Sequence, residues 1–297
     1  MHSVMNSKPN IQRKRSFSGV VLFLIVITLS LGSNTSYSNQ EFTMGVFPYL
    51  PASRIQERYI PVAEDLSKVL HKPVHLKTRN SFRNFQIAVE KQEYDLIFLQ
   101  PFDYVRTAAQ YGYQAIGRPQ GELSAVFVVL PGSRINNLAD LKGKRIAMPP
   151  KGAAVSLLGL KLLIDNAIDI KTDVSISYQS NHFACMKQLL IKKVDACVTA
   201  DVPKKMFERR SEVNLKVLKE TRAIPKALFA AHKRVPQNEQ QEIISRMADW
   251  SNTASGRNIL NGLQFESIIP ANDRTYDVVR TIWNSIKDQQ TFLIDEQ

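Results

Sequence analysis

The sequence has few cysteines, no hydrophobic run long enough to span a bilayer and no metal-binding pattern. Its 297 residues include two cysteines, Cys185 and Cys197, which are too few for a disulfide scaffold and lack the CxxC spacing of a zinc site. Glycine and proline occur in ordinary numbers, and 44% hydrophobic with 22% charged residues excludes disorder, collagen and coiled coil as the main state. At roughly 100–200 residues per domain, this length indicates one large or two medium domains.

Enzyme signatures are also missing. The chain contains no GxSxG, HExxH, GxGxxG or GxxxxGK[ST] motif. His71 and His75 are four residues apart, but Pro73 between them opposes a continuous helix, so we expect no metal site. Cys185 lies in an apolar helical pattern, which predicts a buried core thiol, and a disulfide with Cys197 is the alternative. We therefore predict no enzyme activity, no cofactor and no metal.

The first 38 residues have the pattern of a secretory signal peptide. Four basic residues and no acidic residue precede a twelve-residue apolar run, Val20 to Leu31, and a Ser36-Tyr37-Ser38 cleavage pattern follows. As a helix this run spans only about 18 Å, short of the roughly 30 Å bilayer core. Cleavage lowers the net charge from +12 to +8. A basic exported protein favours anionic partners, whether small anions, lipid headgroups or cell-wall polymers, and without Lys/Arg blocks nucleic acid is not expected.

From residue 42 onward, short apolar runs alternate with helical patterns. Ile60, Ala63, Leu66 and Val69 illustrate the three-and-four spacing of a helix face. Strand and helix in turn predict an α/β fold with largely parallel sheets that helices flank. The expected strands are 42–47, 74–78, 95–99, 125–130, 145–148, 174–178, 195–199, 215–218 and 227–231.

An internal repeat predicts two lobes. Ser81 opens a helical stretch that ends before the strand beginning at Asp95, and Ser180 opens one that ends before the strand beginning at Asp195. We expect a first lobe of 41–123 and 227–297, a second lobe of 125–224, and two hinge crossings. Because ligands of open α/β sheets gather at the carboxyl ends of strands, a cleft between the two lobes is the expected binding site.

The candidate ligand-binding residues all lie where strands end or helices begin, and each has a structural alternative. Pro48 and Tyr49 follow the first strand, as a ligand contact or a packed turn. Gln100, Pro101 and Phe102 follow the strand 95–99, where proline suits a helix start. The segment Lys151, Gly152, Ala153 and Ala154 leads into a helix whose free amides can bind an anion, or forms a simple turn.

The second-lobe candidates are Asn181, His182 and Asp201. Ser180 or Asn181 is expected to cap a helix, and His182 at its first turn either donates to an oxyanion or covers the helix end. Asp201 follows the strand 195–199 as a helix cap or a polar ligand contact.

Over about residues 42–250 the sequence resembles the periplasmic solute-binding proteins of ABC importers for phosphonate, phosphite and phosphate, which have the type II binding-protein fold. The resemblance rests on GVFPYLPASRIQERY, EYDLIFLQPFDYV, LADLKGKRIAMPP and SYQSNHFACMKQLLIKKVDACVTAD. It implies that Tyr49, His182 and Asp201 match family site residues. The family's Ser-Thr-Ser helix start falls on Ala153, Ala154 and Val155, so its hydroxyls are missing. Lys226 and Ala227 stand where relatives often carry an aspartate.

The resemblance implies a monomeric binding protein that closes over a small anionic solute and docks on a membrane permease. A ligand-sensing module of the same fold, which regulates a membrane-bound signalling partner, is the alternative. The altered helix start leaves the ligand open between phosphonate, another anion and a more apolar molecule.

Overall fold

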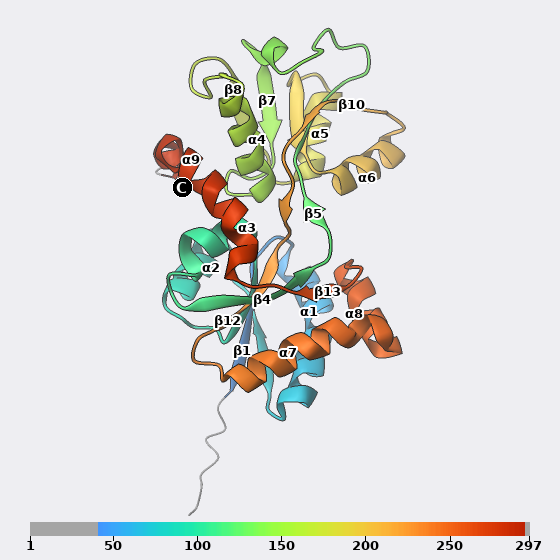
Figure 1. Ribbon diagram of the computed structural model, residues 1–297. Coiled ribbons are helices and arrows are strands. Elements are labelled where there is room, and N and C mark those ends of the chain that lie inside the picture. The colour runs from blue at the N-terminus through green and yellow to red at the C-terminus, as the bar shows by residue number, and fades with distance from the viewer. Residues whose placement is uncertain (1–40, 295–297) are drawn as a thin grey trace, which may run out of the picture. The chain divides into compact units, whose positions relative to one another are not determined.

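The computed structural model describes residues 41–294, with side chains as far as 288. This part of the chain contains a six-stranded sheet, a five-stranded sheet and a two-stranded sheet (Figure 1). The expected signal peptide lies outside the described residues. None of the helices within 41–294 is both long enough and apolar enough to cross a bilayer.

The six-stranded sheet collects strands from both ends of the described chain. Its order is β13-β4-β12-β3-β1-β2. The strands are β1 (Phe42–Val46), β2 (Val74–Lys77), β3 (Leu96–Leu99), β4 (Tyr113–Pro119), β12 (Leu228–His232) and β13 (Ile268–Pro270).

The five-stranded sheet is formed by the middle of the chain, in the order β10-β6-β9-β7-β8. Its strands are β6 (Val126–Val129), β7 (Arg145–Met148), β8 (Ser175–Tyr178), β9 (Ala196–Thr199) and β10 (Lys216–Glu220). The two-stranded sheet pairs β5 (Glu122–Leu123) with β11 (Ile224–Pro225).

Both larger sheets are mixed, which corrects the expectation of largely parallel sheets. The pairs β1–β2, β1–β3, β7–β8 and β7–β9 are parallel. Strands β12 and β6 run antiparallel to β3 and β9, and β4, β13 and β10 are joined by further antiparallel pairs. The physical reason is the route of the chain. It enters β6 and β12 through short extended crossings, whereas parallel neighbours need a crossover connection such as a helix.

Helices lie between most of these strands. They are α1 (Ala52–Leu70), α2 (Phe82–Glu90), α3 (Pro101–Asp103), α4 (Ala154–Asp165), α5 (His182–Leu190), α6 (Asp201–Ser211), α7 (Gln237–Asp249), α8 (Ala254–Leu263) and α9 (Asp277–Ile294). A π-helical turn, Tyr104–Ala108, continues α3, and single 3-10 turns lie at 139–141, 250–252 and 273–276. In α1 the fully buried face comprises Ile55, Tyr59, Val62 and Leu66. Ile60, which the sequence pattern placed on the buried face, is 45% exposed, so the face is rotated from the predicted one.

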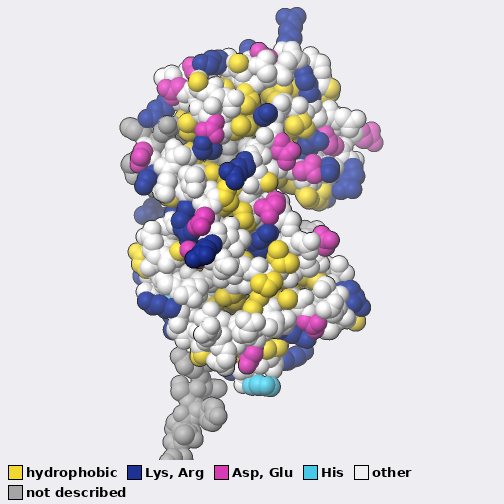
Figure 2. Space-filling model, viewed as in Figure 1, with side chains coloured by type: hydrophobic (Ala, Val, Ile, Leu, Met, Phe, Trp, Pro, Cys, Tyr) yellow, Lys and Arg dark blue, Asp and Glu magenta, His cyan; other side chains and the backbone are white. Residues whose placement is uncertain are grey.

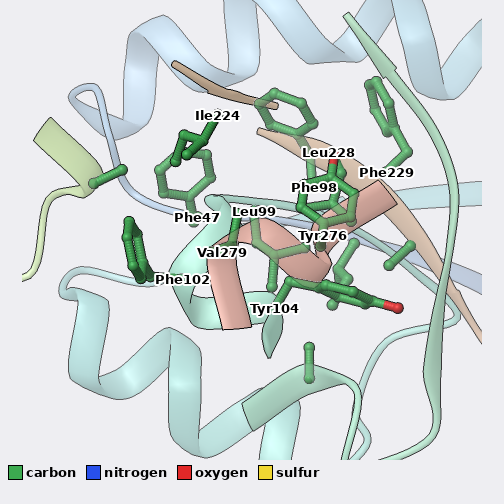
Figure 3. Close-up of a cluster of buried hydrophobic side chains, with 14 of the residues drawn as sticks. Phe47, Phe98, Leu99, Phe102, Tyr104, Ile224, Leu228, Phe229, Tyr276 and Val279 are labelled. Atoms are coloured by element: carbon green, nitrogen blue, oxygen red, sulfur yellow. The ribbon is translucent and has the colours of Figure 1, made fainter. Parts of the chain in front are cut away.

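An aromatic cluster fills the core beside the six-stranded sheet. The Phe98 ring lies 4.7 Å from that of Phe229, 5.5 Å from that of Tyr59 and 5.7 Å from that of Phe47, measured between centroids. Figure 3 shows Phe98 with Phe47 and Phe229. Aromatic pairs at these distances add about 0.5–1.5 kcal/mol each beyond their buried area. The same cluster fixes the first turn after β1, where the site residues begin.

The chain passes between the two larger sheets twice. The segments β4-β5-β6 and β10-β11-β12 carry it across, and Ile224 pairs with Leu123 where the two segments meet. Beside them, the hydroxyl of Thr221 accepts a hydrogen bond from the amide of Ala125 at 2.9 Å. These crossings lie within a few residues of the expected hinge, and the lobe boundaries themselves stay a prediction.

The C-terminal segment, which the sequence predicts to belong to the first lobe, contacts elements of both larger sheets. Helix α7 contacts α1, β4 and β13 of the six-stranded sheet, as expected. Helix α9 contacts α3 and the π-helical turn, but it also runs beside α4, which belongs with the five-stranded sheet (Figure 1). One helix therefore touches elements of both sheets.

Charged side chains of both signs are interspersed on the face shown in Figure 2. Many are paired along a helix or turn, as Lys204 with Glu208 at 2.9 Å and Arg54 with Glu57 at 2.7 Å. Such pairs contribute at most about 1 kcal/mol each where they are exposed. The surface charge therefore favours solubility more than stability.

Candidate functional site

Gln100 joins the carboxyl end of β3, in the six-stranded sheet, to the start of α4. It follows β3, and its side-chain Oε1 accepts a hydrogen bond from the amide of Ala154 at 3.0 Å. Its Nε2 donates to the carbonyl oxygen of Gly152 at 2.8 Å. Two of the predicted segments, 100–102 and 151–154, therefore meet, although more than fifty residues separate them.

The residues after Gln100 hold its side chain in place. Pro101 fills the first position of α3, where a proline ring matches the helical φ angle. Phe102 is fully buried in the hydrophobic core (Figure 3), so in this structure it is a packing residue. Asp103 accepts a hydrogen bond from Gln100 Nε2 at 2.8 Å and pairs with Arg106 at 2.8 Å. Burial raises the pKa of Asp103, while Arg106 and Gln100 act in the opposite direction.

The sequence analysis missed Asp103 and Arg106. The signal that was present is their spacing, because Gln100, Asp103 and Arg106 follow one another at intervals of three residues, which places them on one helix face.

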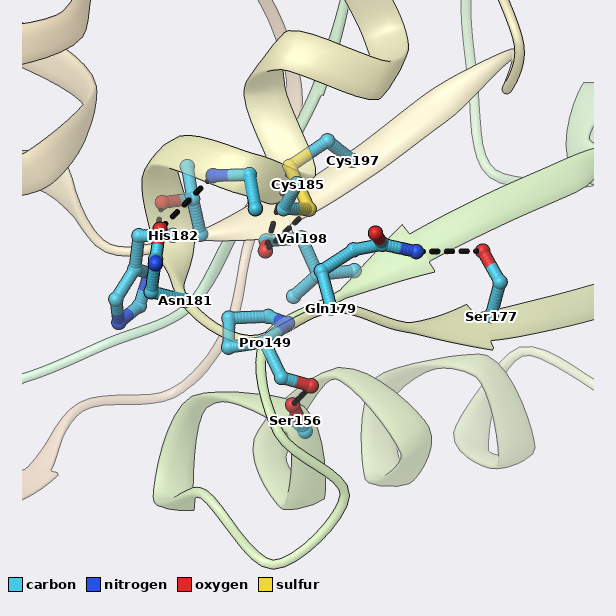
Figure 4. The surroundings of a disulfide bond; sticks show 11 residues. Pro149, Ser156, Ser177, Gln179, Asn181, His182, Cys185, Cys197 and Val198 are labelled. Atoms are coloured by element: carbon cyan, nitrogen blue, oxygen red, sulfur yellow. Dashed lines mark hydrogen bonds between the residues drawn. A yellow bond between two sulfur atoms is a disulfide. The ribbon is translucent and has the colours of Figure 1, made fainter. Parts of the chain in front are cut away.

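The start of α4 is built from backbone groups. Ala153 is the N-cap in an extended conformation, and its methyl side chain supplies no hydrogen bond to the helix. Ser156, in the first turn, is fully buried and donates its hydroxyl to the carbonyl oxygen of Pro149 at 3.0 Å (Figure 4). Lys151 is half-buried, and the space beside Gly152 is open enough that an added Cβ would meet no atom within 4 Å.

His182 begins α5 on the five-stranded sheet. The side chain of Asn181 caps this helix by accepting from the amide of Ala184 at 2.9 Å, so the N-cap is Asn181 rather than Ser180. His182 Nδ1 lies 2.9 Å from the hydroxyl of Thr199, the last residue of β9. Burial lowers the pKa of His182 to about 4, so the ring is neutral at pH 7. The sequence analysis missed Thr199, although its place at a strand's carboxyl end was the available signal.

A disulfide ties α5 to β9 directly behind this pair. Cys185 and Cys197 are bonded and fully buried (Figure 4), so the expectation of a free core thiol was wrong and the alternative is confirmed. The helix and the strand are neighbours through a tight turn, which brings the two Cα atoms within 5.9 Å. The bond fixes α5 against the strand that carries Thr199, and so it helps to hold His182 in position.

Tyr49 lies in the aromatic wall at the end of β1. Its ring stacks on Phe47 at 4.8 Å, and its hydroxyl lies 3.1 Å from that of Tyr59. Burial raises the pKa of Tyr49, while Tyr59 and Arg58 act in the opposite direction. Phe82, at the start of α2, is 37% exposed and packs edge-on against Phe47. The carboxyl end of β1 therefore presents aromatic surface.

Asp201 has a partner on its own helix. It occupies the first turn of α6, is exposed, and pairs with Lys205 at 2.6 Å. Lys226, at the position where the resemblance expects an aspartate in relatives, donates to the carbonyl oxygen of Gln120 at 3.0 Å. Neither contact brings these two residues to Gln100 or His182.

The described residues contain no group of three or more His, Cys, Asp or Glu side chains that could hold a metal ion. A cavity of about 230 Å³ lies elsewhere, between α4, α9 and the crossing at Thr221, and none of the predicted site residues lines it. The arrangement at the strand ends instead offers backbone amides, a neutral imidazole and aromatic surface. These groups can bind a small polar solute.

Comparison with known proteins places the chain in a family. Residues 44–276 match the family model described as "ABC transporter, phosphonate, periplasmic substrate-binding protein". Among solved structures, PhnD1 from Prochlorococcus marinus (MIT 9301) in complex with methylphosphonate is similar with a TM-score of 0.72 and 17% identity, covering 84% of this chain and 99% of that one.

Two further structures have the same fold. A binding protein of an ABC phosphonate transporter from Pseudomonas aeruginosa has a TM-score of 0.68 and 13% identity, covering 84% of this chain and 87% of the other. The aliphatic sulphonate binding protein SsuA from Escherichia coli has a TM-score of 0.59 and 14% identity, covering 84% and 93%. At these identities the structures show the fold alone, that of the type II periplasmic binding proteins, and the family is shown by the match over residues 44–276. The chain belongs to the periplasmic substrate-binding proteins of phosphonate ABC transporters.

Proposed function

We propose that this protein captures a small anionic solute of the phosphonate or phosphate class between the carboxyl ends of its two larger sheets and delivers it to the membrane permease of an ABC importer. The family is one of transport binding proteins, not of enzymes, and it is periplasmic. The observation that carries the proposal is the contact of Gln100 with Gly152 and Ala154, because it sets the two strand-end surfaces face to face.

The neutral ring of His182 supplies a hydrogen-bond donor. When the hydroxyl of Thr199 donates to Nδ1, the remaining proton of the imidazole is on Nε2, and Nε2 then donates to an oxygen of the solute. The amides at the start of α4 add donors and the positive end of the helix dipole. Lys151 contributes a positive charge to the same segment, and Tyr49 covers the apolar part of the solute.

The missing hydroxyls at Ala153, Ala154 and Val155 lower the expected affinity. Each lost hydrogen bond to a desolvated oxyanion removes about 1–3 kcal/mol. We therefore expect weaker binding of a phosphoryl group than in relatives that keep the hydroxyls. Asp201 remains a candidate contact, which it makes only by leaving Lys205.

Two lobes, 41–123 with 227–297 and 125–224, are proposed to close over the solute, with the paired crossings at Leu123 and Ile224 as the hinge. A mature monomer released by cleavage of residues 1–38 completes the proposal. Neither the family match nor the similar structures favours the signalling alternative.

A thermal-shift experiment tests the proposed site. Methylphosphonate, phosphate, phosphite and an alkylsulfonate are added to the purified protein, and a solute at 100 times its Kd stabilises the fold by about 2.7 kcal/mol. His182→Ala and Tyr49→Ala should lose this response relative to their own ligand-free melting points. His75→Ala and Tyr111→Ala, which alter exposed side chains, are matched controls. An unchanged response in both site variants would remove these residues from the binding site.

A further inference from the structure

The side chain of Gln100 makes three hydrogen bonds, which use both donor hydrogens of Nε2 and one lone pair of Oε1. Its Oε1 accepts from the amide of Ala154, while its Nε2 donates to the carbonyl oxygen of Gly152 and to Oδ2 of Asp103. The amide of Ala154 is a donor only, and the carbonyl of Gly152 is an acceptor only, so the two ends of the Gln100 amide cannot be exchanged. A glutamate of the same shape cannot make the two donor contacts.

Gln100 is held in this position by buried neighbours. Only 6% of the residue is exposed, and Asp103 beside it is 9% exposed. Arg106 pairs with Asp103, donates to Gln86 Oε1 at 2.9 Å and lies over the ring of Trp283 in α9 at 5.7 Å. The contact with α4 is thus the end of a connected polar network in the first sheet's half of the site.

The amide that Gln100 occupies lies at the first position of α4. Amides at a helix start have no partner inside the helix and carry the positive end of its dipole, which makes them donors to bound anions. Here the N-cap Ala153 has no polar side chain, and the acceptor comes instead from a residue 54 positions earlier in the chain. The chain itself supplies the oxygen that a bound anion would otherwise offer.

We propose that Gln100 is an internal ligand of α4, which holds the two halves of the site together without a solute and competes with the anionic group of the solute for the amide of Ala154. This inference rests on the proposed function, because it assumes that the solute's anionic group binds at the start of α4. Gln100 is then the residue that sets the affinity of this site for anions. The solute must displace it to bind.

The expected effect follows from the two hydrogen bonds between the halves. Two neutral hydrogen bonds change an equilibrium by about 5- to 150-fold together. Removing them should lower the ratio of closed to open molecules by that factor in the absence of a solute. It should also tighten anion binding by up to the same factor, because the competing closed state disappears.

The ligand-free test is a distance measurement by double electron–electron resonance. Spin labels at Glu64→Cys on α1 and Lys187→Cys on α5 report on the two halves, since both positions are exposed and the native cysteines are bonded to each other. Gln100→Met keeps the side-chain volume and removes the hydrogen bonds. Gln240→Met, which removes a side-chain bond of the same kind from α7, is the matched control. The Gln100 variant should show a longer or broader distance distribution. Identical distributions would overturn the latch, by which we mean the contact of Gln100 with the start of α4 that holds the two halves of the site together.

The binding test is calorimetric titration with methylphosphonate. Gln100→Ala should bind more tightly than the unmodified protein and the Gln240→Ala control, whereas unchanged or weaker binding would overturn the competition. If no variant binds any of the four anions while the Gln100→Met distances still lengthen, the proposed solute class fails and the latch stands. If anions bind but the distances do not change, the proposed function stands and the latch fails.

Discussion

The neutral state of His182 makes a testable prediction about pH. In the folded protein burial lowers the pKa of His182 to about 4, whereas in the unfolded chain the ring has its ordinary pKa of 6.5. Between pH 6.5 and pH 4 the imidazole is therefore mostly protonated in the unfolded chain and mostly neutral in the folded protein. The contribution of the neutral His182 to the free energy of unfolding is fully present above pH 6.5, and it is lost as the pH falls toward 4.

The magnitude follows from the two pKa values. The loss from this residue is about 2 kcal/mol at pH 5 and about 3 kcal/mol below pH 4. These figures are upper bounds, because the ring is half-buried and water screens part of its charge.

Urea unfolding at pH 7.5, 6.5, 5.5 and 5.0 measures the effect. The free energy of unfolding of His182→Asn should fall less steeply with pH than that of the unmodified protein, by up to about 2 kcal/mol over this range. His75→Asn, which changes an exposed imidazole, is the control and should follow the unmodified protein. Parallel curves for all three proteins would refute the desolvation of His182.

Two further predictions concern the fold around the site. The Cys185–Cys197 disulfide closes a short loop, because the two cysteines are 12 residues apart in the sequence. Its reduction should lower the free energy of unfolding by about 3 kcal/mol on a chain-entropy estimate, which is measured as a lower melting temperature in dithiothreitol. Asp65 is buried and accepts hydrogen bonds from Arg246 at 2.9 and 2.7 Å and from Trp250 at 2.8 Å, so Asp65→Ala should cost about 1–3 kcal/mol in urea unfolding by leaving the buried indole N–H of Trp250 without an acceptor.

Each of these two predictions has a control variant. The Cys185→Ser/Cys197→Ser double variant should melt at the same temperature with and without dithiothreitol, and a reductant effect that persists in it would exclude the disulfide as the cause. Glu57→Ala, which removes an exposed pair with Arg54, should cost less than about 1 kcal/mol. An equally small cost for Asp65→Ala would contradict the importance assigned to its buried contacts.

Strands with apolar or alternating runs of four or more residues were predictable, and β4 and the shortest strands, β5, β11 and β13, were not. All nine expected strands are present within two residues of their predicted bounds. Strand β4 was missed because its sequence, YQAIGRP, mixes polar side chains, a glycine and a proline, and it forms through pairing with β12. Strand β13 is only three residues long. The direction of a strand depends on which neighbour it meets, and the antiparallel pairs follow from crossings that no local pattern encodes.

The candidate site residues were predictable where a local sequence pattern, such as a helix start or a proline, marks their position. Asn181 at a helix start and Gln100 before a proline carry such signals, and the structure gives both the expected backbone positions. The partner of Gln100 across more than fifty residues has no local signal, because it depends on how two sheets face each other. The same holds for Thr199, which meets His182 only once α5 has packed on β9.

A crystal structure of the protein with methylphosphonate tests the central claim most directly. The account predicts the phosphonate between the start of α4 and His182, with a phosphonate oxygen on the amide of Ala154 and the Gln100 side chain displaced from it. A phosphonate bound in the cavity between α4 and α9, or one that leaves His182 and the start of α4 untouched, would contradict the account.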